Sequence, residues 1–382
     1  MMRIFKQKTN IDFIGQRRTA LFASSLCCIA ILGGIVLFGF NFGVDFAGGT
    51  LMEAKFFEPV SAETIREVGA KGDLPDIQVQ SIGAREDNTF LLRVGGTTQL
   101  TQEHAEKTKA SVQAQTQLQS FYADLGNGLI NLRTANKVEA QTLAQMLSTS
   151  EAAVKEVREL GEAQSGGFDY QIVFSGMADK VQTALRMGLA GKPFEIRRVD
   201  YVGPQVGKQL RNKGIAALVY ATLAIIVYIA FRFDFKFGPG ALVSMVHDVL
   251  IVFGYYLITQ REFNLTAIAA ILTVVGYSVN DTIVIYDRIR EEMARFKGRP
   301  FADIVNLSIN ETLSRTILTS GVTSLSLVGL LIFGQGEIFD FAAAMLLGVI
   351  VATYSSIFVA SPLTLWFERR LNKEKKESPI PV

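Results

Sequence analysis

The chain has 382 residues, of which 49% are hydrophobic and 19% charged, and its formal net charge is only +2. This balance, without a basic stripe interleaved with aromatic residues, argues against nucleic acid as a partner. The cysteines, Cys27 and Cys28, are adjacent in an apolar stretch, and the histidines, His104 and His247, stand far apart. The sequence therefore predicts no disulfide framework, no metal site and no cofactor.

The first apolar stretch follows a basic N-terminal segment. Residues 1–18 contain five basic side chains, and residues 19–40 contain no charge. A run of about 20 apolar residues can cross the hydrocarbon core, whereas the apolar core of a signal peptide has only about 7–15 residues. We expect a retained first transmembrane helix, with a cleaved signal peptide as the alternative.

The middle of the chain, residues 41–212, is mixed in character and is typical of a water-facing α/β domain. Strands are expected at 51–57, 77–82, 89–94, 170–174 and 194–200, and helices at 62–70 and 177–189. This order is typical of a split β-α-β sandwich, so we predict a ferredoxin-like domain.

Residues 97–166 form a Gln/Ala/Glu-rich segment with few β-branched residues, which favours helices inserted into the domain. Its apolar residues approximate one helical face: Val112, Leu118, Phe121, Tyr122, Leu125, Leu129 and Leu132. The sequence predicts an antiparallel helical hairpin, which buries this face against Leu143, Met146, Leu147, Val154 and Val157 and turns at 127–128 or 131–136. A flexible Gln-rich linker is the alternative.

Five more apolar spans make up residues 213–367, and a basic tail follows at 368–382. The spans are expected at 214–231, 237–258, 265–285, 316–333 and 341–367. Proline removes a helix hydrogen bond, so Pro362 is expected to kink or end the last span. The chain as a whole is predicted to be a polytopic α-helical membrane protein with six transmembrane helices.

Basic residues orient the predicted bundle. They gather in segment 1–18, in the loops after the second and fourth spans, and in the tail, whereas loops 259–264 and 334–340 contain only Arg261. Because basic loops stay in the cytoplasm, we expect both termini to be cytoplasmic and the α/β domain to lie on the outer side. In a bacterium this means a multi-pass protein of the inner membrane with a periplasmic domain.

Three ionisable residues fall inside predicted spans: Asp248, Asp281 and Arg315. On insertion scales each costs about 2.5–3.5 kcal/mol at a helix centre. Asp281 lies near the cytoplasmic end of the fourth span and Arg315 opens the fifth, so we expect similar depths on antiparallel neighbours. Burial disfavours a charged carboxylate and a nearby arginine favours it, so a small helix movement could load or release a proton at Asp281. The alternatives are a static ion pair and an Arg315 that reaches the membrane interface.

Other polar residues in the spans have a simpler interpretation. His247 and Asp248 lie in the middle of the third span, where such residues often form hydrogen bonds between helices. Asn280 precedes Asp281 and is grouped with them as intramembrane polar support.

A glycine-containing motif, residues 43–50, follows the first span directly. Gly43, Asp45, Gly48 and Gly49 are its candidate signature residues, and adjacent glycines permit a tight turn where the chain leaves the membrane. The motif lacks the lysine of a phosphate loop, and no nucleophile elbow or Ser-His-Asp order is present. We therefore expect no enzyme, and any work done by the chain must draw on an external source such as the membrane potential.

These motifs together resemble the SecF family of the bacterial protein-export machinery, within the resistance-nodulation-division superfamily. The matching segments are 43–50, 202–207, 275–282, 287–291, 314–316 and 319–321. The inserted segment 97–166 departs from the family because it is longer than the usual connection.

The resemblance implies a half-transporter whose other half is SecD, with Asp281 and Arg315 as proton-relay residues and a further carboxylate from SecD. It implies that proton flow assists late steps of Sec-dependent translocation, with the SecYEG translocon, YajC, secreted polypeptides and membrane lipid as partners. Two other functions stay open: half of a proton-driven exporter of small molecules or lipids, and a non-conducting scaffold of a membrane complex.

Overall fold

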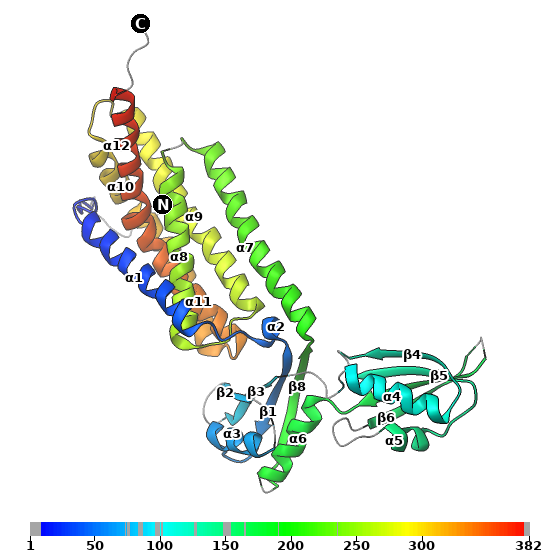
Figure 1. Ribbon diagram of the computed structural model, residues 1–382. Coiled ribbons are helices and arrows are strands. Elements are labelled where there is room, and N and C mark those ends of the chain that lie inside the picture. The colour runs from blue at the N-terminus through cyan, green and yellow to red at the C-terminus, as the bar shows by residue number, and fades with distance from the viewer. Residues whose placement is uncertain are drawn as a thin grey trace. The chain divides into compact units, whose positions relative to one another are not determined.

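The structure, a computed structural model, describes residues 9–377 except 73, 75–76, 83–86, 96–99, 101, 126–127, 148–153, 164–165, 190 and 235. The chain forms two compact units. One is Gly43–Arg211 and contains two β-sheets; the other combines Met1–Phe42 with Asn212–Val382 and contains most of the long apolar helices (Figure 1).

Six helices of the described chain are long and apolar enough to cross a membrane, which confirms the predicted number. They are α1 (Arg17–Phe38), α7 (Pro204–Arg232), α8 (Gly238–Thr259), α9 (Leu265–Arg295), α10 (Phe301–Phe333) and a last span of α11 (Glu337–Ser355), η2 (Ser356–Ala360) and α12 (Ser361–Glu377). Two of them, α9 and α10, extend beyond their apolar parts, where Arg288 pairs with Glu311 across the two helices at 2.5 Å.

The centre of the membrane unit consists of α8, α9 and the last span. About half of their apolar stretches is buried, compared with 11% for α1 and α7 and 17% for α10. Close approach of α9 and α11 depends on Gly348, because a Cβ at that position would lie only 2.1 Å from Cγ2 of Val274. Three of the six helices therefore expose most of their apolar surface when the chain is alone.

Pro362 neither ends nor interrupts the last span. The π-helical turn η2 directly precedes Ser361 and Pro362, and helix α12 continues to Glu377. Since proline has no backbone N–H and its ring crowds the preceding turn, the wider π-turn accommodates it without breaking the helix.

The first sheet of the other unit has the order β2-β3-β1-β8, with antiparallel neighbours. Its elements are β1 (Gly49–Phe56), α3 (Ala62–Lys71), β2 (Gln78–Ile82), β3 (Thr89–Val94), α6 (Met177–Gly188) and β8 (Phe194–Val202). This β-α-β-β-α-β order confirms the predicted ferredoxin-like fold.

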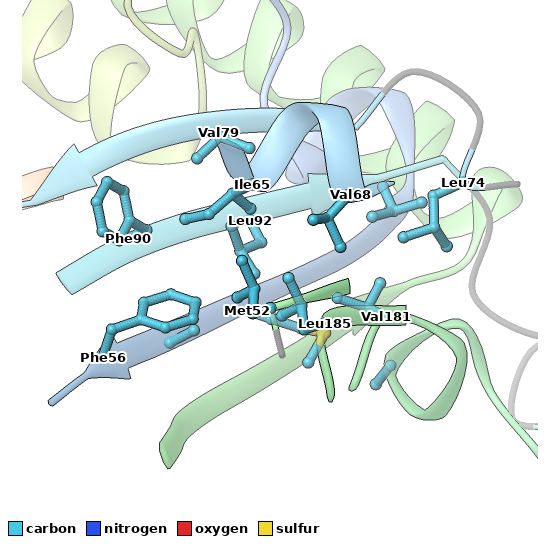
Figure 2. Close-up of a cluster of buried hydrophobic side chains, with 14 residues drawn as sticks. Met52, Phe56, Ile65, Val68, Leu74, Val79, Phe90, Leu92, Val181 and Leu185 are labelled. Atoms are coloured by element: carbon cyan, nitrogen blue, oxygen red, sulfur yellow. The ribbon is translucent and has the colours of Figure 1, made fainter. Parts of the chain in front are cut away.

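Side chains from α3 and α6 cover one face of this sheet. Figure 2 shows Ile65 and Val68 of α3 above Leu92, with Val181 and Leu185 of α6 close to Met52. Alternate residues of the strands supply the core, as a pleated sheet with one covered face requires.

The prediction of a helical hairpin in the insertion is wrong, and so is the alternative of a flexible linker. The described part of this region forms α4 (Gln102–Gln115), β4 (Leu118–Asp124), β5 (Leu129–Thr134), α5 (Ala140–Leu147), β6 (Val154–Glu162) and β7 (Phe168–Phe174). These strands make a second antiparallel sheet in the order β4-β5-β7-β6. The strand predicted at 170–174 belongs to this sheet and not to the first.

The apolar residues of the insertion follow the two-residue period of a strand and not the predicted period of a helix. Ile130, Leu132 and Thr134 are buried while the residues between them are half-buried, which is the alternation of a strand. Gly128 has a positive φ of 63° in the connection between the antiparallel strands β4 and β5. The other residue of the turn predicted at 127–128 lies outside the described residues. Leu118, Phe121 and Leu132 do enter one core with Leu143 and Leu147, but from strands rather than from a helix.

The two sheets have equivalent strand orders. If β7 is placed before α4, the insertion reads β7-α4-β4-β5-α5-β6 with the order β4-β5-β7-β6, which corresponds element by element to the first sheet. The insertion is therefore a second ferredoxin-like fold in circularly permuted form. The insertion starts with α4 and ends with β7, which are consecutive elements of the unpermuted fold and are therefore expected to lie close together. It can thus fit between β3 and α6 without disturbing the first sheet.

We predict that Ile130→Ala loosens the inserted fold. Removal of this fully buried side chain should cost about 2–5 kcal/mol. Amide hydrogen exchange of β5 and β7 in the full-length protein should accelerate, while the matched change Asn131→Ala on the opposite face should have a smaller effect. Equal exchange in the two variants would contradict the assigned core.

Candidate ion-relay site

Asp281 is an acidic residue buried at the centre of the membrane unit. It lies on α9, which packs against α8, α10 and α11, and only 2% of its surface is exposed. Its Oδ2 atom is buried without a hydrogen-bond partner among the residues that the structure describes. An unsatisfied charged oxygen is costly in such surroundings, so this carboxylate favours a bound proton or an additional partner.

Hydroxyl groups from three helices surround this carboxylate. The hydroxyl groups of Ser320 on α10 and Thr353 on α11 lie within hydrogen-bonding reach of the Asp281 carboxylate. Their two oxygen atoms lie 2.6 Å apart. The Tyr277 hydroxyl of α9 donates to Ser320 Oγ at 3.1 Å. A hydroxyl group can rotate and can both donate and accept a hydrogen bond. These hydroxyl groups can therefore donate to the carboxylate, or accept a hydrogen bond from its protonated form.

Arg315 does not form a salt bridge with Asp281. Helices α9 and α10 do pack together, as expected, but the Arg315 side chain is exposed and no ion pair within 4.0 Å joins it to Asp281 in the described chain. Its positive charge still acts on Asp281 through space. The static ion pair is therefore absent in this conformation, and Arg315 lies where a movement of α10 would change its effect on the carboxylate.

His247 and Asp248 form a second buried polar cluster, which links three helices. Asp248 is completely buried, its Oδ1 lies 2.9 Å from His247 Nδ1, and its Oδ2 accepts hydrogen bonds from Ser278 at 2.5 Å and Ser355 at 2.7 Å. Ser244 donates to Ser355 at 3.0 Å. This arrangement agrees with the expected hydrogen bonding between helices.

Asn280 does not join either cluster. Its side chain is exposed, on the same side of α9 as Thr273 and Gly276. Nothing lies within 4 Å of a Cβ built on Gly276, so this helix face is open in the single chain.

The sequence did not assign the hydroxyl residues around the two carboxylates to the site. Ser278, Ser320, Thr353 and Ser355 stand in apolar spans, where polar residues are uncommon. Ser278 lies three residues before Asp281, on the same side of the helix, and this spacing was the available signal. The contributions of α11 could not be found in this way, because no spacing along the chain connects α9 with α11.

The glycine motif has the backbone role that was expected. Gly43 precedes the short helix α2 (Val44–Ala47), and Gly48 and Gly49 have positive φ values of 75° and 132°. A Cβ on Gly49 would lie 2.7 Å from the Val94 carbonyl oxygen of β3. Glycine is needed where the chain turns into β1, because a side chain would meet both strain and a clash.

The segment 202–207 packs against the glycine motif at 43–50. A Cβ on Gly207 would lie 3.1 Å from the Gly48 nitrogen and 3.2 Å from the Phe46 oxygen. The segments 43–50 and 202–207 therefore support one another at the two ends of the ferredoxin-like fold. Within the described residues, no group of three His, Cys, Asp or Glu side chains could hold a metal ion.

Comparison with known families matches two parts of the chain. Residues 182–370 match the family described as protein export membrane protein SecD/SecF, C-terminal, and residues 33–59 match the SecD/SecF GG motif. A protein translocase subunit SecF from Magnetococcus marinus is 40% identical over 365 residues, which cover 95% of this chain and 94% of the relative. One from Koribacter versatilis is 34% identical and covers 96% of this chain and 94% of the relative.

Solved structures give the same result. A crystal structure of SecDF in a super-membrane-facing form is 28% identical with a TM-score of 0.59, and covers 98% of this chain and 41% of that chain. A SecDF structure from Thermus has a TM-score of 0.58 and also 28% identity, covering 97% of this chain and 40% of that one. The chain thus spans about two fifths of these SecDF chains.

Fold and buried polar site define a multi-pass membrane protein with an α/β water-facing domain. By its sequence relatives, the chain belongs to the SecF family of protein-export membrane proteins.

We predict that Ser355→Ala destabilises the membrane unit more than Ser326→Ala does. The Ser355 hydroxyl donates to the buried Asp248, whereas Ser326 is exposed and donates only to a carbonyl of its own helix. Loss of a donor to a buried charge should cost about 1–3 kcal/mol. Thermal unfolding of the purified protein with its co-purified partner measures the difference, and equal midpoints would contradict the assigned contact.

Proposed function

We propose that this chain is a protein-export subunit that couples proton movement across the membrane to late steps of Sec-dependent translocation. The observation that carries the proposal is Asp281, a buried carboxylate with one oxygen that has no hydrogen-bond partner among the described residues. It lies beside a row of hydroxyl groups and is close enough to the exposed Arg315 to interact with its charge. The family membership supports the export role, and the site supports proton coupling.

The cycle follows from the two states of Asp281. In the conformation described here, Arg315 is not paired with Asp281, and burial favours the neutral, protonated carboxyl group. A movement of α10 that brings the Arg315 guanidinium closer would stabilise the carboxylate and release the proton. Ser320, which lies on α10 and acts on Asp281, would move with it and alter the hydroxyl chain.

The energy available to this step is sufficient for a conformational change. One proton crossing the whole membrane yields about 2.3 kcal/mol per 100 mV. This free energy corresponds to a shift of roughly 50-fold in a two-state equilibrium. Helix movement in the membrane could then be transmitted to the outer α/β domain, which would act on secreted polypeptides.

The proposed partner in the membrane is SecD, whose spans would complete a bundle of twice this size. The open face of α9 around Thr273, Gly276 and Asn280, and the exposed Arg315 of α10, offer polar groups and close approach to such a partner. SecYEG, YajC and membrane lipid are further proposed partners. The distribution of basic residues supports an inner-membrane location with both termini in the cytoplasm.

We predict that Asp281→Asn assembles normally but loses proton-dependent export. Asparagine keeps the shape of the side chain and cannot exchange a proton. Export in membrane vesicles should fall to the level seen without a proton gradient, while the control Asp303→Asn, an exposed residue of α10, should export like the wild type. Wild-type export by Asp281→Asn at normal protein levels would favour a scaffold.

We also predict that Gly276→Leu weakens assembly with SecD. No atom of this chain lies within 4 Å of a Cβ at this position, so we expect the fold to be retained while the leucine fills the open face of α9. Gly33→Leu on α1 is a matched control, because nothing lies within 4 Å of that position either. Co-purification with SecD should drop at least about tenfold for Gly276→Leu only, a loss of roughly 1.4 kcal/mol. Equal recovery of SecD would exclude this face as the interface.

A further inference from the structure

The His247–Asp248 pair has features that hydrogen bonding between helices does not require. Neither side chain is more than 7% exposed, and the pair is held at 2.9 Å between Nδ1 and Oδ1. Asp248 Oδ2 already accepts two hydroxyl donors, which is the environment of an ionised carboxylate. Nδ1 of His247 must then carry a hydrogen and donate it to Oδ1.

This arrangement leaves Nε2 as the atom of His247 that can gain or lose a proton. Nε2 has no hydrogen-bond partner in the described part of the chain. The nearest ring is that of Tyr354, with 6.2 Å between ring centroids, and the Tyr354 hydroxyl is occupied by Ser24 at 3.0 Å and the Ala20 carbonyl at 3.2 Å.

Net charge gives a physical reason for proton uptake. With a neutral imidazole, the pair carries one negative charge inside the apolar bundle, and with an imidazolium it carries none. A buried pair of opposite charges with its hydrogen bonds satisfied is far less costly than a single buried charge. A proton on Nε2 would therefore make the buried pair neutral overall.

Few titratable groups on the packed helices face this pair. Helix α8 packs against α1, α9, α11, η2 and α12. Cys28 of α1 interacts electrostatically with Asp248. Tyr354 comes from α11, and Asp281 lies on α9 one turn beyond Ser278, whereas η2 and the adjoining residues 361–367 carry no acidic, basic, tyrosine, cysteine or histidine side chain.

The same serines that bind Asp248 connect the pair to the first site. Ser278 is on α9 with Asp281, and Ser355 is on α11 two residues after Thr353, which acts on Asp281. A change of charge on His247 alters the strength of the hydrogen bonds that Asp248 accepts from Ser278 and Ser355. The change therefore reaches α9 and α11, two of the three helices that surround Asp281.

We propose that His247, oriented by Asp248, is a second proton-binding group of the bundle, which gains and releases a proton at Nε2 and transmits the change through Ser278 and Ser355 to the helices around Asp281. Neutral imidazole takes up one proton to become imidazolium, and Asp248 supplies the counter-charge. The role in transport rests on the proposed function, whereas proton binding by His247 does not.

The direct test is nitrogen-15 NMR of the histidine-labelled protein in its reconstituted complex, with the His247 signal assigned by its loss in His247→Gln. We expect Nε2 to change from its neutral to its protonated chemical shift as the pH is lowered, while Nδ1 stays protonated. Asp248→Asn should lower the proton affinity at least about tenfold. A His247 signal that does not change with pH while the complex stays folded would overturn the proposal.

The functional test compares export at several pH values for His247→Gln and the control His104→Gln, which alters the chain's other histidine outside the membrane unit. Only His247→Gln should change the pH profile, and an unchanged profile would refute the coupling. If His247→Gln fails to assemble, the His247 signal of this chain is assigned as the one that remains in His104→Gln, and the NMR titration of the wild type still decides. Normal export by Asp281→Asn would reject the proposed function, and would leave the NMR result on His247 standing.

Discussion

Two carboxylates buried among apolar helices, Asp248 and Asp281, impose the strongest constraint on this protein, since a bundle interior offers little water to solvate a charge. Asp248 is satisfied by a histidine and two serines from neighbouring helices. Asp281 keeps one oxygen without a partner. The Asp248 carboxylate joins helices through satisfied hydrogen bonds, whereas the unsatisfied oxygen of Asp281 can take a proton or a further partner, so the bundle interior has two different polar parts.

The hydroxyl residues connect these two parts. Ser278 and Asp281 share α9, and Thr353 and Ser355 share α11, so each of these helices contributes to both clusters. Gly348 lets α9 and α11 approach closely enough for this. Small side chains and hydroxyls are what interhelical packing in a membrane requires, because apolar burial alone provides little attraction between helices there.

The uneven burial of the helices shows which of them are most exposed in the single chain. The apolar stretches of α1, α7 and α10 are mostly exposed, whereas those of α8, α9 and the last span are half buried. Lipid can cover apolar side chains, but Arg315 and Asn280 are polar and exposed next to the same site. Exposed polar groups at this position support the proposed protein partner, and this chain spans about two fifths of the solved SecDF chains.

The sequence by itself determined the six spans and the candidate ionisable residues, because apolar length and intramembrane charge are local properties that a linear pattern retains. It also gave the ferredoxin-like order of the first sheet. The prediction for the insertion is wrong because its short apolar runs suit a helix or a strand, and only the pairing of β4 with β5 and of β5 with β7 selects the strands. Likewise, only the tertiary structure decided which hydroxyl groups of α10 and α11 reach Asp248 and Asp281, and that Arg315 forms no ion pair with Asp281. These distances depend on how different helices pack, which no spacing along the chain determines.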